Sequence, residues 1–463
     1  MSSVLRRGAA RLAAATVVSG LVAAGAIAVA GPAMAEEGPQ STGGATATLG
    51  GLAVFDTVTV PGKGEVSAGL FEMDVTPGGA LQTYCIDFHT NALKGKEYKE
   101  VGWDQSSLHD NENAGKIRWI LQNSYPQKND LAELAKKAGV PSLTEKTAAA
   151  ATQAAIWQFS DNIDAVPNDA SAKALTEYLE KNAQDLEEPK ASLSLSPSSV
   201  AGKTGERLGP ITVSTNAASA AVSLVPGAPA GVKLVDKDGK VVTSVANGGQ
   251  VFFDVPAGAA DGAAELTVQA DTNIPIGRAF VSTKVKSQTL ILAGTSTSTV
   301  SAKATATWAK KGAIPAVSAV KNCAKGGLEV TASNEGDEDF TFELKGKKVT
   351  IPGGKSETVT IPLAEDQAYD FTITGPNGFE KNFKGVFDCK TATPGPAPSE
   401  TPSTEPSPST PAGTTGGSTG GSGDLAETGS SNATPMIAGI AALLVVLGGG
   451  AVFFLRKKKT VGQ

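Results

Sequence analysis

Cys85 is the residue of this sequence whose chemistry most needs an explanation. The chain has 463 residues and three cysteines. Cys323 and Cys389 lie near the two ends of one β-rich segment, and in an exported chain they most simply form a disulfide. Cys85 is then left unpaired in an oxidising compartment, which indicates a reactive thiol. The alternative is a small buried apolar residue, the commonest role of a lone cysteine.

Gln153 is a polar residue on an apolar helical face. It lies in "AAAATQAAIWQF", and three- and four-residue spacings put it on one stripe with Ala149, Ala150, Ile156 and Trp157. An unpaired buried carboxamide costs roughly 1–3 kcal/mol, so this side chain needs a hydrogen-bond partner, such as a backbone carbonyl, or a chemical purpose. A thiolate that attacked the carboxamide would expel ammonia and leave a Cys–Gln thioester.

Two elements must bring the thiol and the carboxamide together. The stretch "QTYCIDF" at 82–88 alternates Tyr, Ile and Phe with Thr, Cys and Asp, which predicts a strand with Cys85 on the side opposite the aromatic residues. The helix around Gln153 has capping-box spacing at Ser142 and Glu145, and its alanines let another backbone approach closely. The expected core residues of this region include Trp103, Trp119, Trp157 and Tyr84.

Two motifs resemble those of one family. "YCID" at 84–87 and "TQAAIW" at 152–157 are similar to the paired motifs of the thioester domains of Gram-positive surface adhesins, and "KIRWILQNSYP" looks like their middle segment. The resemblance covers about residues 45–188 and implies an α+β domain in which Cys85 and Gln153 form an internal thioester. An amine on a partner would displace the sulfur and become joined to Gln153. Such a thioester would be used once, without turnover and without a cofactor.

An enzyme interpretation stays open beside this one. Cys85 would be the nucleophile of a cysteine hydrolase or transferase, with His89 or His109 as its base. His89 would lie about 13 Å along an extended strand, too far to reach the thiol directly. His109 lies in the loop-like stretch "SSLHDNEN". A non-covalent surface binding or structural protein is the other alternative, and a titratable thiol at Cys85 would distinguish both from a thioester.

Both ends of the chain carry sorting signals. Residues 1–35 hold three arginines, an apolar run and the cleavage site Ala33-Met34-Ala35, as a secretory signal peptide does. Residues 435–455 are apolar and long enough to span a bilayer, and the basic tail at 456–463 would stay in the cytoplasm. The sequence therefore predicts an exported chain that is first held at the membrane by its C-terminus.

A pentapeptide at 425–429 precedes the apolar span. The order of pentapeptide, apolar span and basic tail resembles the cell-wall sorting signal of Gram-positive surface proteins, in the LAxTG form. The resemblance implies that a sortase cuts after Thr428 and joins it to peptidoglycan, whereas an ordinary single-pass membrane protein is the alternative. The motif residues are Leu425, Ala426, Glu427, Thr428 and Gly429.

The composition changes along the rest of the chain. Residues 190–310 contain short β runs with turn signals, which predicts an immunoglobulin-like β-sandwich. Residues 315–390 predict a second such domain, with the cysteine pair at its ends. Residues 391–424 are rich in Pro, Ser, Thr and Gly and predict a disordered stalk. Related surface proteins often carry isopeptide bonds in such β-domains, but the sequence does not single out a pair of residues.

The charge of the chain limits its partners. The net charge is −6, and loss of 1–35 and 429–463 would remove seven of 40 Lys and Arg but none of 46 Asp and Glu, which gives −13. An acidic surface argues against nucleic acid and against an anionic membrane as partner. Two histidines and three cysteines argue against a zinc site. We therefore expect no metal, contact with the membrane only through the span before sorting, and an unidentified amine-bearing surface ligand.

Overall fold

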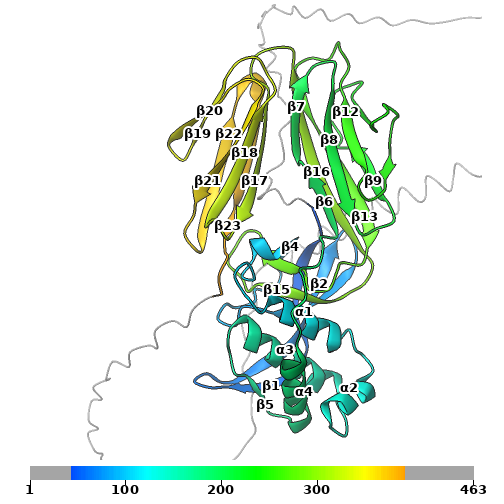
Figure 1. The fold of residues 1–463 in the computed structure, drawn as a ribbon, viewed down its shortest axis with the longest axis vertical. Helices are drawn as coiled ribbons and strands as arrows, with labels where there is room; N and C mark the ends of the chain where they lie inside the picture. Colours follow the sequence, from blue (N-terminus) through cyan, green and yellow to red (C-terminus); the bar gives the residue numbers. More distant parts are fainter. Residues whose placement is uncertain (1–42, 392–463) are drawn as a thin grey trace, which may run out of the picture. The chain divides into compact units, whose positions relative to one another are not determined.

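The computed structural model describes residues 43–391 (Figure 1). The signal peptide at 1–35, nearly all of the stalk at 391–424, the sorting motif at 425–429, the apolar segment at 435–455 and the tail at 456–463 lie outside the described residues, so they stay predictions. Between residues 43 and 391, no helix is long and apolar enough to cross a membrane.

A seven-stranded antiparallel sheet carries Cys85. The strand order is β2-β3-β15-β14-β4-β1-β5, and β1 also pairs with β2, so the sheet closes on itself. The long β1–β2 hairpin contains two register shifts that bend it along its length. The strands are β1 (Thr46–Val60), β2 (Gly64–Thr76), β3 (Ala80–Cys85), β4 (Glu97–Val101), β5 (Val166–Pro167), β14 (Ala279–Ser282) and β15 (Leu290–Thr295).

Strands β14 and β15 differ from the expectation that residues 190–310 form a separate β-sandwich. Strand β14 pairs with β4, and β15 pairs with β3. Residues 290–294 are all buried, which is typical of a strand covered on both faces. A continuous apolar run shows no alternation, so the sequence did not indicate which sheet the strand joins. The unit expected at 45–188 is therefore completed by a segment about a hundred residues further along the chain.

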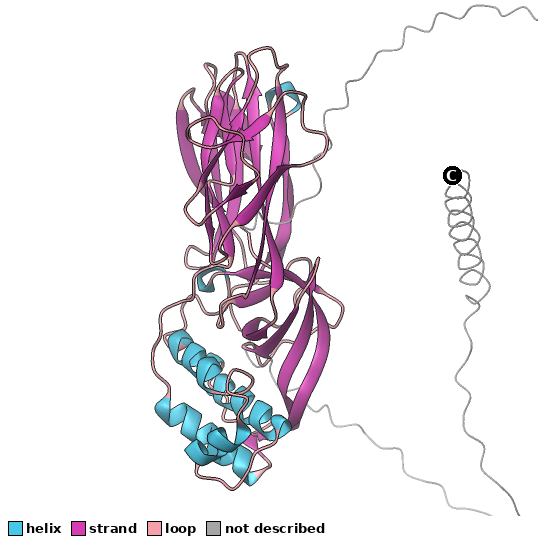
Figure 2. Cartoon of the chain, turned by 90° about the vertical axis from the view of Figure 1, so that its right-hand side faces the viewer, coloured by secondary structure: helices cyan, strands magenta, loops and turns pink. Residues whose placement is uncertain are grey.

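Four α-helices gather beside this sheet (Figure 2). They are α1 (Ala114–Asn123), α2 (Leu131–Ala138), α3 (Glu145–Ser160) and α4 (Ala170–Asn182), and a short 3₁₀ turn, η1 (Trp103–Gln105), precedes them. Helix α3 lies among β1, β2, α1 and α4. Its residues from Ala148 to Trp157 are buried all round. Such a helix is a central core element, which explains its many small alanines.

The start of α3 differs from the expected one. Thr144 caps the helix, because its hydroxyl accepts the Thr147 N–H at 3.1 Å while the Thr147 hydroxyl accepts the Thr144 N–H at 2.9 Å. The expected pair, Ser142 and Glu145, is therefore not the cap, and the helix begins two residues later. A threonine does at the third helical position what glutamate usually does there.

Two further sheets follow in the chain. One has the order β10-β12-β8-β6 and the other β11-β9-β13-β16-β7, and buried apolar residues of both, such as Phe253 and Trp308, belong to one core. The immunoglobulin-like fold stays a prediction. The strands are β6 (Leu193–Ser196), β7 (Ser199–Lys203), β8 (Arg207–Thr215), β9 (Ala220–Leu224), β10 (Lys233–Val235), β11 (Ser244–Val245), β12 (Gln250–Asp254), β13 (Gly262–Thr272) and β16 (Ser298–Ala309).

The last described unit is also built of strands, with the disulfide at its end. Cys323 follows β17, Cys389 follows β23, and their sulfurs are bonded, with Cα atoms 5.5 Å apart. A separate apolar core fills the unit. The elements are β17 (Pro315–Asn322), β18 (Gly327–Asn334), β19 (Phe340–Leu344), β20 (Lys347–Ile351), β21 (Lys355–Pro362), β22 (Gln367–Thr374), the 3₁₀ turn η2 (Pro376–Gly378) and β23 (Glu380–Phe387).

Replacing both disulfide cysteines by serine should destabilise this last unit. The bridge closes a loop between residues 66 apart, and such cross-links typically contribute about 2–4 kcal/mol. Urea unfolding of Cys323→Ser/Cys389→Ser should therefore show a less stable C-terminal transition than the parent. The chemistry at Cys85 should not change, since it lies in another sheet. Labelling of both cysteines by a thiol reagent in the unreduced native protein would contradict the pairing.

Candidate functional site

Cys85 ends β3 at a place where one neighbouring strand is missing. On one side β15 pairs with β3, and the Ile86 N–H donates to the Thr289 carbonyl at 3.1 Å. On the other side the pairing of β2 with β3 stops at Thr83. Because the main-chain groups of successive residues point to opposite edges of a strand, the N–H and C=O of Cys85 face the side that β2 has left.

The carboxamide of Gln153 occupies that vacant edge. The Cys85 N–H donates to Gln153 Oε1 at 2.9 Å, and Gln153 Nε2 donates to the Cys85 carbonyl at 2.9 Å. The Gln153 side chain is 0% exposed and the Cys85 side chain 1%. The structure therefore brings the two predicted residues together, with both polar atoms of the amide hydrogen-bonded to the backbone of the cysteine.

The thiol of Cys85 lies in a dry and acidic environment. Burial raises its pKa well above the usual value, the nearby Asp161 carboxylate raises it further, and the Trp157 indole opposes the rise. The buried Trp157 N–H has no hydrogen-bond partner of normal geometry in the described chain. The Asp87 N–H donates to the sulfur at 3.3 Å. The thiol is therefore neutral at rest and has donors beside it for a developing negative charge.

Asp161 is a functional candidate that the sequence reasoning missed. It ends α3, and its carboxylate accepts the Phe88 N–H at 3.1 Å and the Ser160 hydroxyl at 2.6 Å. Burial raises the pKa of Asp161 to about 6, although both hydrogen bonds lower it. The sequence feature that could have indicated Asp161 is its position eight residues after Gln153, about two turns along the same helix, which places both residues on one side of it.

Phe88 and Trp157 cover this region. Phe88 is 7% exposed and Trp157 is 5% exposed, and their rings meet edge to face with centroids 4.9 Å apart. Lys63, from the β1–β2 turn, places its Nζ 4.2 Å from the centroid of the Phe88 ring. Trp157 is a core residue as expected, but it also borders the thiol.

Neither histidine serves Cys85. His89 was expected further along the same strand, but β3 ends at Cys85 and His89 packs edge-on against Phe88. His109 interacts with the Ser106 carbonyl and with Asp110. In the described chain, neither imidazole forms a hydrogen bond with the Cys85 thiol.

The other expected core residues take structural positions. The Tyr84 hydroxyl donates to the Tyr125 carbonyl at 2.8 Å, and the Trp103 indole N–H donates to the Gly277 carbonyl at 2.8 Å. Tyr84 is fully buried, whereas Trp103 and Trp119 are half-buried. Cys85 packs in a different apolar cluster from Tyr84, as expected from strand alternation, although both sides of β3 are buried.

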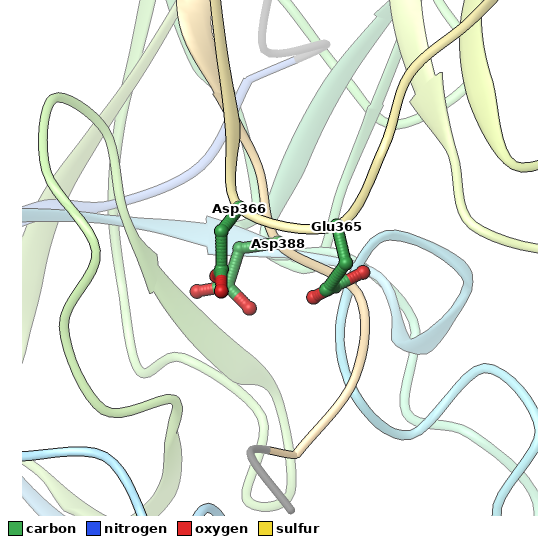
Figure 3. Close-up of side chains that lie close together, drawn as sticks. All are labelled: Glu365, Asp366 and Asp388. Carbon is green, nitrogen blue, oxygen red and sulfur yellow. The ribbon is translucent and has the colours of Figure 1, made fainter.

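A second group of polar residues lies at the disulfide end (Figure 3). Oxygens of Glu365, Asp366 and Asp388 lie within 4.8 Å of one another. Protein groups already bind two of these carboxylates, because Glu365 accepts the N–H groups of residues 389–390 and Asp366 pairs with Lys286 Nζ at 2.6 Å. The cluster is therefore part of a charged contact between the last β unit and the loop before β15.

Lys321, on β17 of the last β unit, lies beside this cluster. Its Nζ donates to the Asp388 main-chain carbonyl at 2.9 Å. Burial lowers the pKa of Lys321 and raises that of Asp388. The sequence reasoning missed this pair, although Lys321 lies two residues before Cys323 and Asp388 one residue before Cys389, so the predicted disulfide implied their proximity.

Comparison with known proteins gives two family matches. Residues 82–185 match the thioester domain family, and residues 313–386 match the family of the bacterial phospholipase C, C-terminal domain. No curated protein is significantly similar to the chain.

Three similar solved structures carry related descriptions. The Bacillus anthracis TIE protein is 16% identical over 75% of this chain and 81% of its own, with a TM-score of 0.27. The thioester domain of the Enterococcus faecium TIE86 protein is 18% identical over 57% and 97%, with a TM-score of 0.27. The N-terminal thioester domain of a Clostridium perfringens surface protein is 17% identical over 32% and 89%, with a TM-score of 0.22. On the family match, residues 82–185, which include Cys85 and Gln153, belong to the thioester domain family.

Proposed function

We propose that Cys85 and Gln153 form an internal thioester, and that the protein uses it to attach covalently to amine groups on a partner surface. The observation that carries the proposal is the clamping of the Gln153 carboxamide by both main-chain groups of Cys85, at 2.9 Å each. This arrangement keeps the electrophilic carbon next to the residue that bears the nucleophile. Proximity of this kind replaces a bimolecular encounter with an intramolecular one.

The hydrogen bonds support a route by which the thioester forms. The Cys85 sulfur attacks Cδ of Gln153 as the thiol proton leaves, and the N–H of Cys85 stabilises the negative charge that develops on Oε1. The carbon–nitrogen bond then breaks, and Nε2 departs as ammonia after gaining a proton. Asp161 carries the proton from sulfur to nitrogen, since its pKa of about 6 suits both acceptance and release near neutral pH.

Attachment reverses these roles with a different amine. An uncharged amine attacks Cδ, the carbon–sulfur bond breaks, and the released sulfur takes up the proton lost by the amine. The products are an amide on Gln153 and a free thiol on Cys85, so each molecule reacts once and does not turn over. A thiolate leaves far more easily than an amide nitrogen, which makes the attachment favourable and long-lived. Burial of both residues limits hydrolysis before the partner arrives.

The surroundings of the domain fit a cell-surface adhesin. In this proposal the signal peptide at 1–35 exports the chain, a sortase joins Thr428 to peptidoglycan, and the stalk at 391–424 carries the folded part outward. The β units after the thioester domain act as immunoglobulin-like spacers. An amide bond to the partner resists dissociation under shear, which suits a tethered molecule.

The intact mass of the protein tests the thioester. A chain of residues 36–391 should be lighter than its sequence by one ammonia, beyond the two hydrogens lost in the disulfide, with no titratable thiol at Cys85. Methylamine should release the thiol and leave a methylamide on Gln153. Cys85→Ala and Gln153→Ala should show no loss of ammonia and no adduct, whereas Gln158→Ala, on the same helix, should behave as the parent does.

The full sequence mass with a titratable Cys85 would contradict the thioester. The same two hydrogen bonds would then satisfy an ordinary buried glutamine, and the domain would be a non-covalent binding module. Turnover of an acyl substrate by the free thiol would instead favour the cysteine hydrolase or transferase.

Asp161→Asn should change the pH dependence of stability. The pKa of Asp161 is about 6 in the folded chain and 3.8 for an ordinary aspartate, so the folded state binds more protons between these values. The free energy of unfolding therefore falls as pH rises from about 4 to 6, by up to roughly 3 kcal/mol from this group. Urea unfolding across this range should show a flatter slope for Asp161→Asn, and Asp74→Asn, at an exposed position on β2, should keep the parent slope.

Thr428→Ala should prevent anchoring to the wall. The parent should be released only when peptidoglycan is digested by a muramidase, whereas the variant should be extracted from membranes by detergent with its basic tail intact. Immunoblots of the two fractions measure this difference. Full-length parent protein in the detergent extract would contradict the anchoring.

A further inference from the structure

The ring of Phe88, which helps to cover the proposed thioester, contacts the ammonium group of Lys63. Lys63 Nζ lies 4.2 Å from the ring centroid, within the range of a cation–π contact. Lys63 is exposed at the tip of the β1–β2 hairpin and makes no ion pair within residues 43–391. Its N–H donates to the Val60 carbonyl at 3.1 Å, so the turn fixes where the side chain starts.

The same ring is linked to the thiol by short contacts. Phe88 packs edge-on against Trp157, and Trp157 borders the Cys85 sulfur. The Phe88 N–H donates to the Asp161 carboxylate at 3.1 Å. The Asp161 carboxylate also lies close enough to the sulfur to raise the pKa of the Cys85 thiol. The residue whose ring contacts a cation is therefore hydrogen-bonded through its main chain to a carboxylate, which favours an ammonium group here.

We infer that the Phe88 ring and the Asp161 carboxylate form an ammonium-docking site for the incoming amine, which Lys63 occupies in the free protein. The inference rests on the proposed function and adds which residues select the partner. A lysine side chain would dock as a cation on the ring, displace Lys63, and give up its proton to Asp161 before its nitrogen attacks Gln153. The site therefore favours flexible primary ammonium groups over uncharged nucleophiles and hydroxyl groups.

Two variants should change amine selectivity in opposite directions. Phe88→Leu keeps an apolar side chain but loses the ring, and Lys63→Gln removes the competing cation. The measurement is the ratio of the second-order rate constants for Nα-acetyl-lysine, cationic at neutral pH, and hydroxylamine, uncharged there, from loss of the thioester by mass spectrometry. We expect Phe88→Leu to lower this ratio about three- to tenfold and Lys63→Gln to raise it about twofold or more.

Matched variants separate docking from packing. Phe88→Tyr retains the ring and should keep the parent ratio, and Lys94→Gln, at another exposed lysine, should also keep it. Tetramethylammonium, a cation that cannot react, should slow the reaction of the parent with Nα-acetyl-lysine and should slow that of Phe88→Leu less.

Several results would overturn the docking site. Unchanged ratios in Phe88→Leu and Lys63→Gln, with the thioester mass present, would refute it and leave the proposed function intact. An amide between Lys63 and Gln153 would also refute it, because Lys63 would then be a substrate. If Phe88→Leu forms no thioester, the rate ratio of Lys63→Gln, a variant at an exposed residue, tests the docking site by itself. A parent without a thioester would refute the proposed function, and the docking site with it.

Discussion

The structure around the site depends on one vacancy in a sheet. Strand β2 leaves β3 after Thr83, so the N–H and C=O of Cys85 lack a strand partner at a buried position. An unsatisfied pair of buried main-chain groups would cost several kcal/mol. The carboxamide of Gln153 replaces the missing strand with two hydrogen bonds. The backbone requirement therefore selects a carboxamide at this position, and an apolar residue in place of Gln153 would leave both main-chain groups of Cys85 unpaired. The proposed chemistry keeps only the hydrogen bond to Oε1, because Nε2, which donates to the Cys85 carbonyl, leaves as ammonia.

The close approach that this needs explains the composition of α3. A helix that presents a glutamine to a strand backbone must come nearer than leucine or phenylalanine would allow. The alanines from 148 to 151 and at 154 and 155 are all fully buried and leave the required space. Trp157 and Phe88 then fill the remaining volume on the side of the sulfur. Small residues thus set the position of the carboxamide, and large residues exclude water from it.

The sequence predicted local features of the site better than its long-range completion. We predicted that Cys85 and Gln153 meet from three features: the alternation in "QTYCIDF", the alanine-rich helix and the paired motifs. In the structure, the Gln153 side chain forms two hydrogen bonds of 2.9 Å with the Cys85 backbone. The sequence indicated a β run at β15 but placed it in the following β-sandwich, because a fully buried strand shows no alternation that would assign it to the sheet of Cys85. Asp161 was missed for a related reason, since its raised pKa arises from tertiary burial that no local pattern encodes.

Strand β15 comes from a part of the chain far from Cys85, and this determines which fragment of the protein contains a complete site. Residues 45–188 alone lack the strand that pairs with Cys85, so they leave the second edge of β3 open. The loop before β15 carries Lys286, which pairs with Asp366 of the disulfide-bonded unit at 2.6 Å. The last β unit is therefore joined by an ion pair to the loop that leads into the strand next to the thiol.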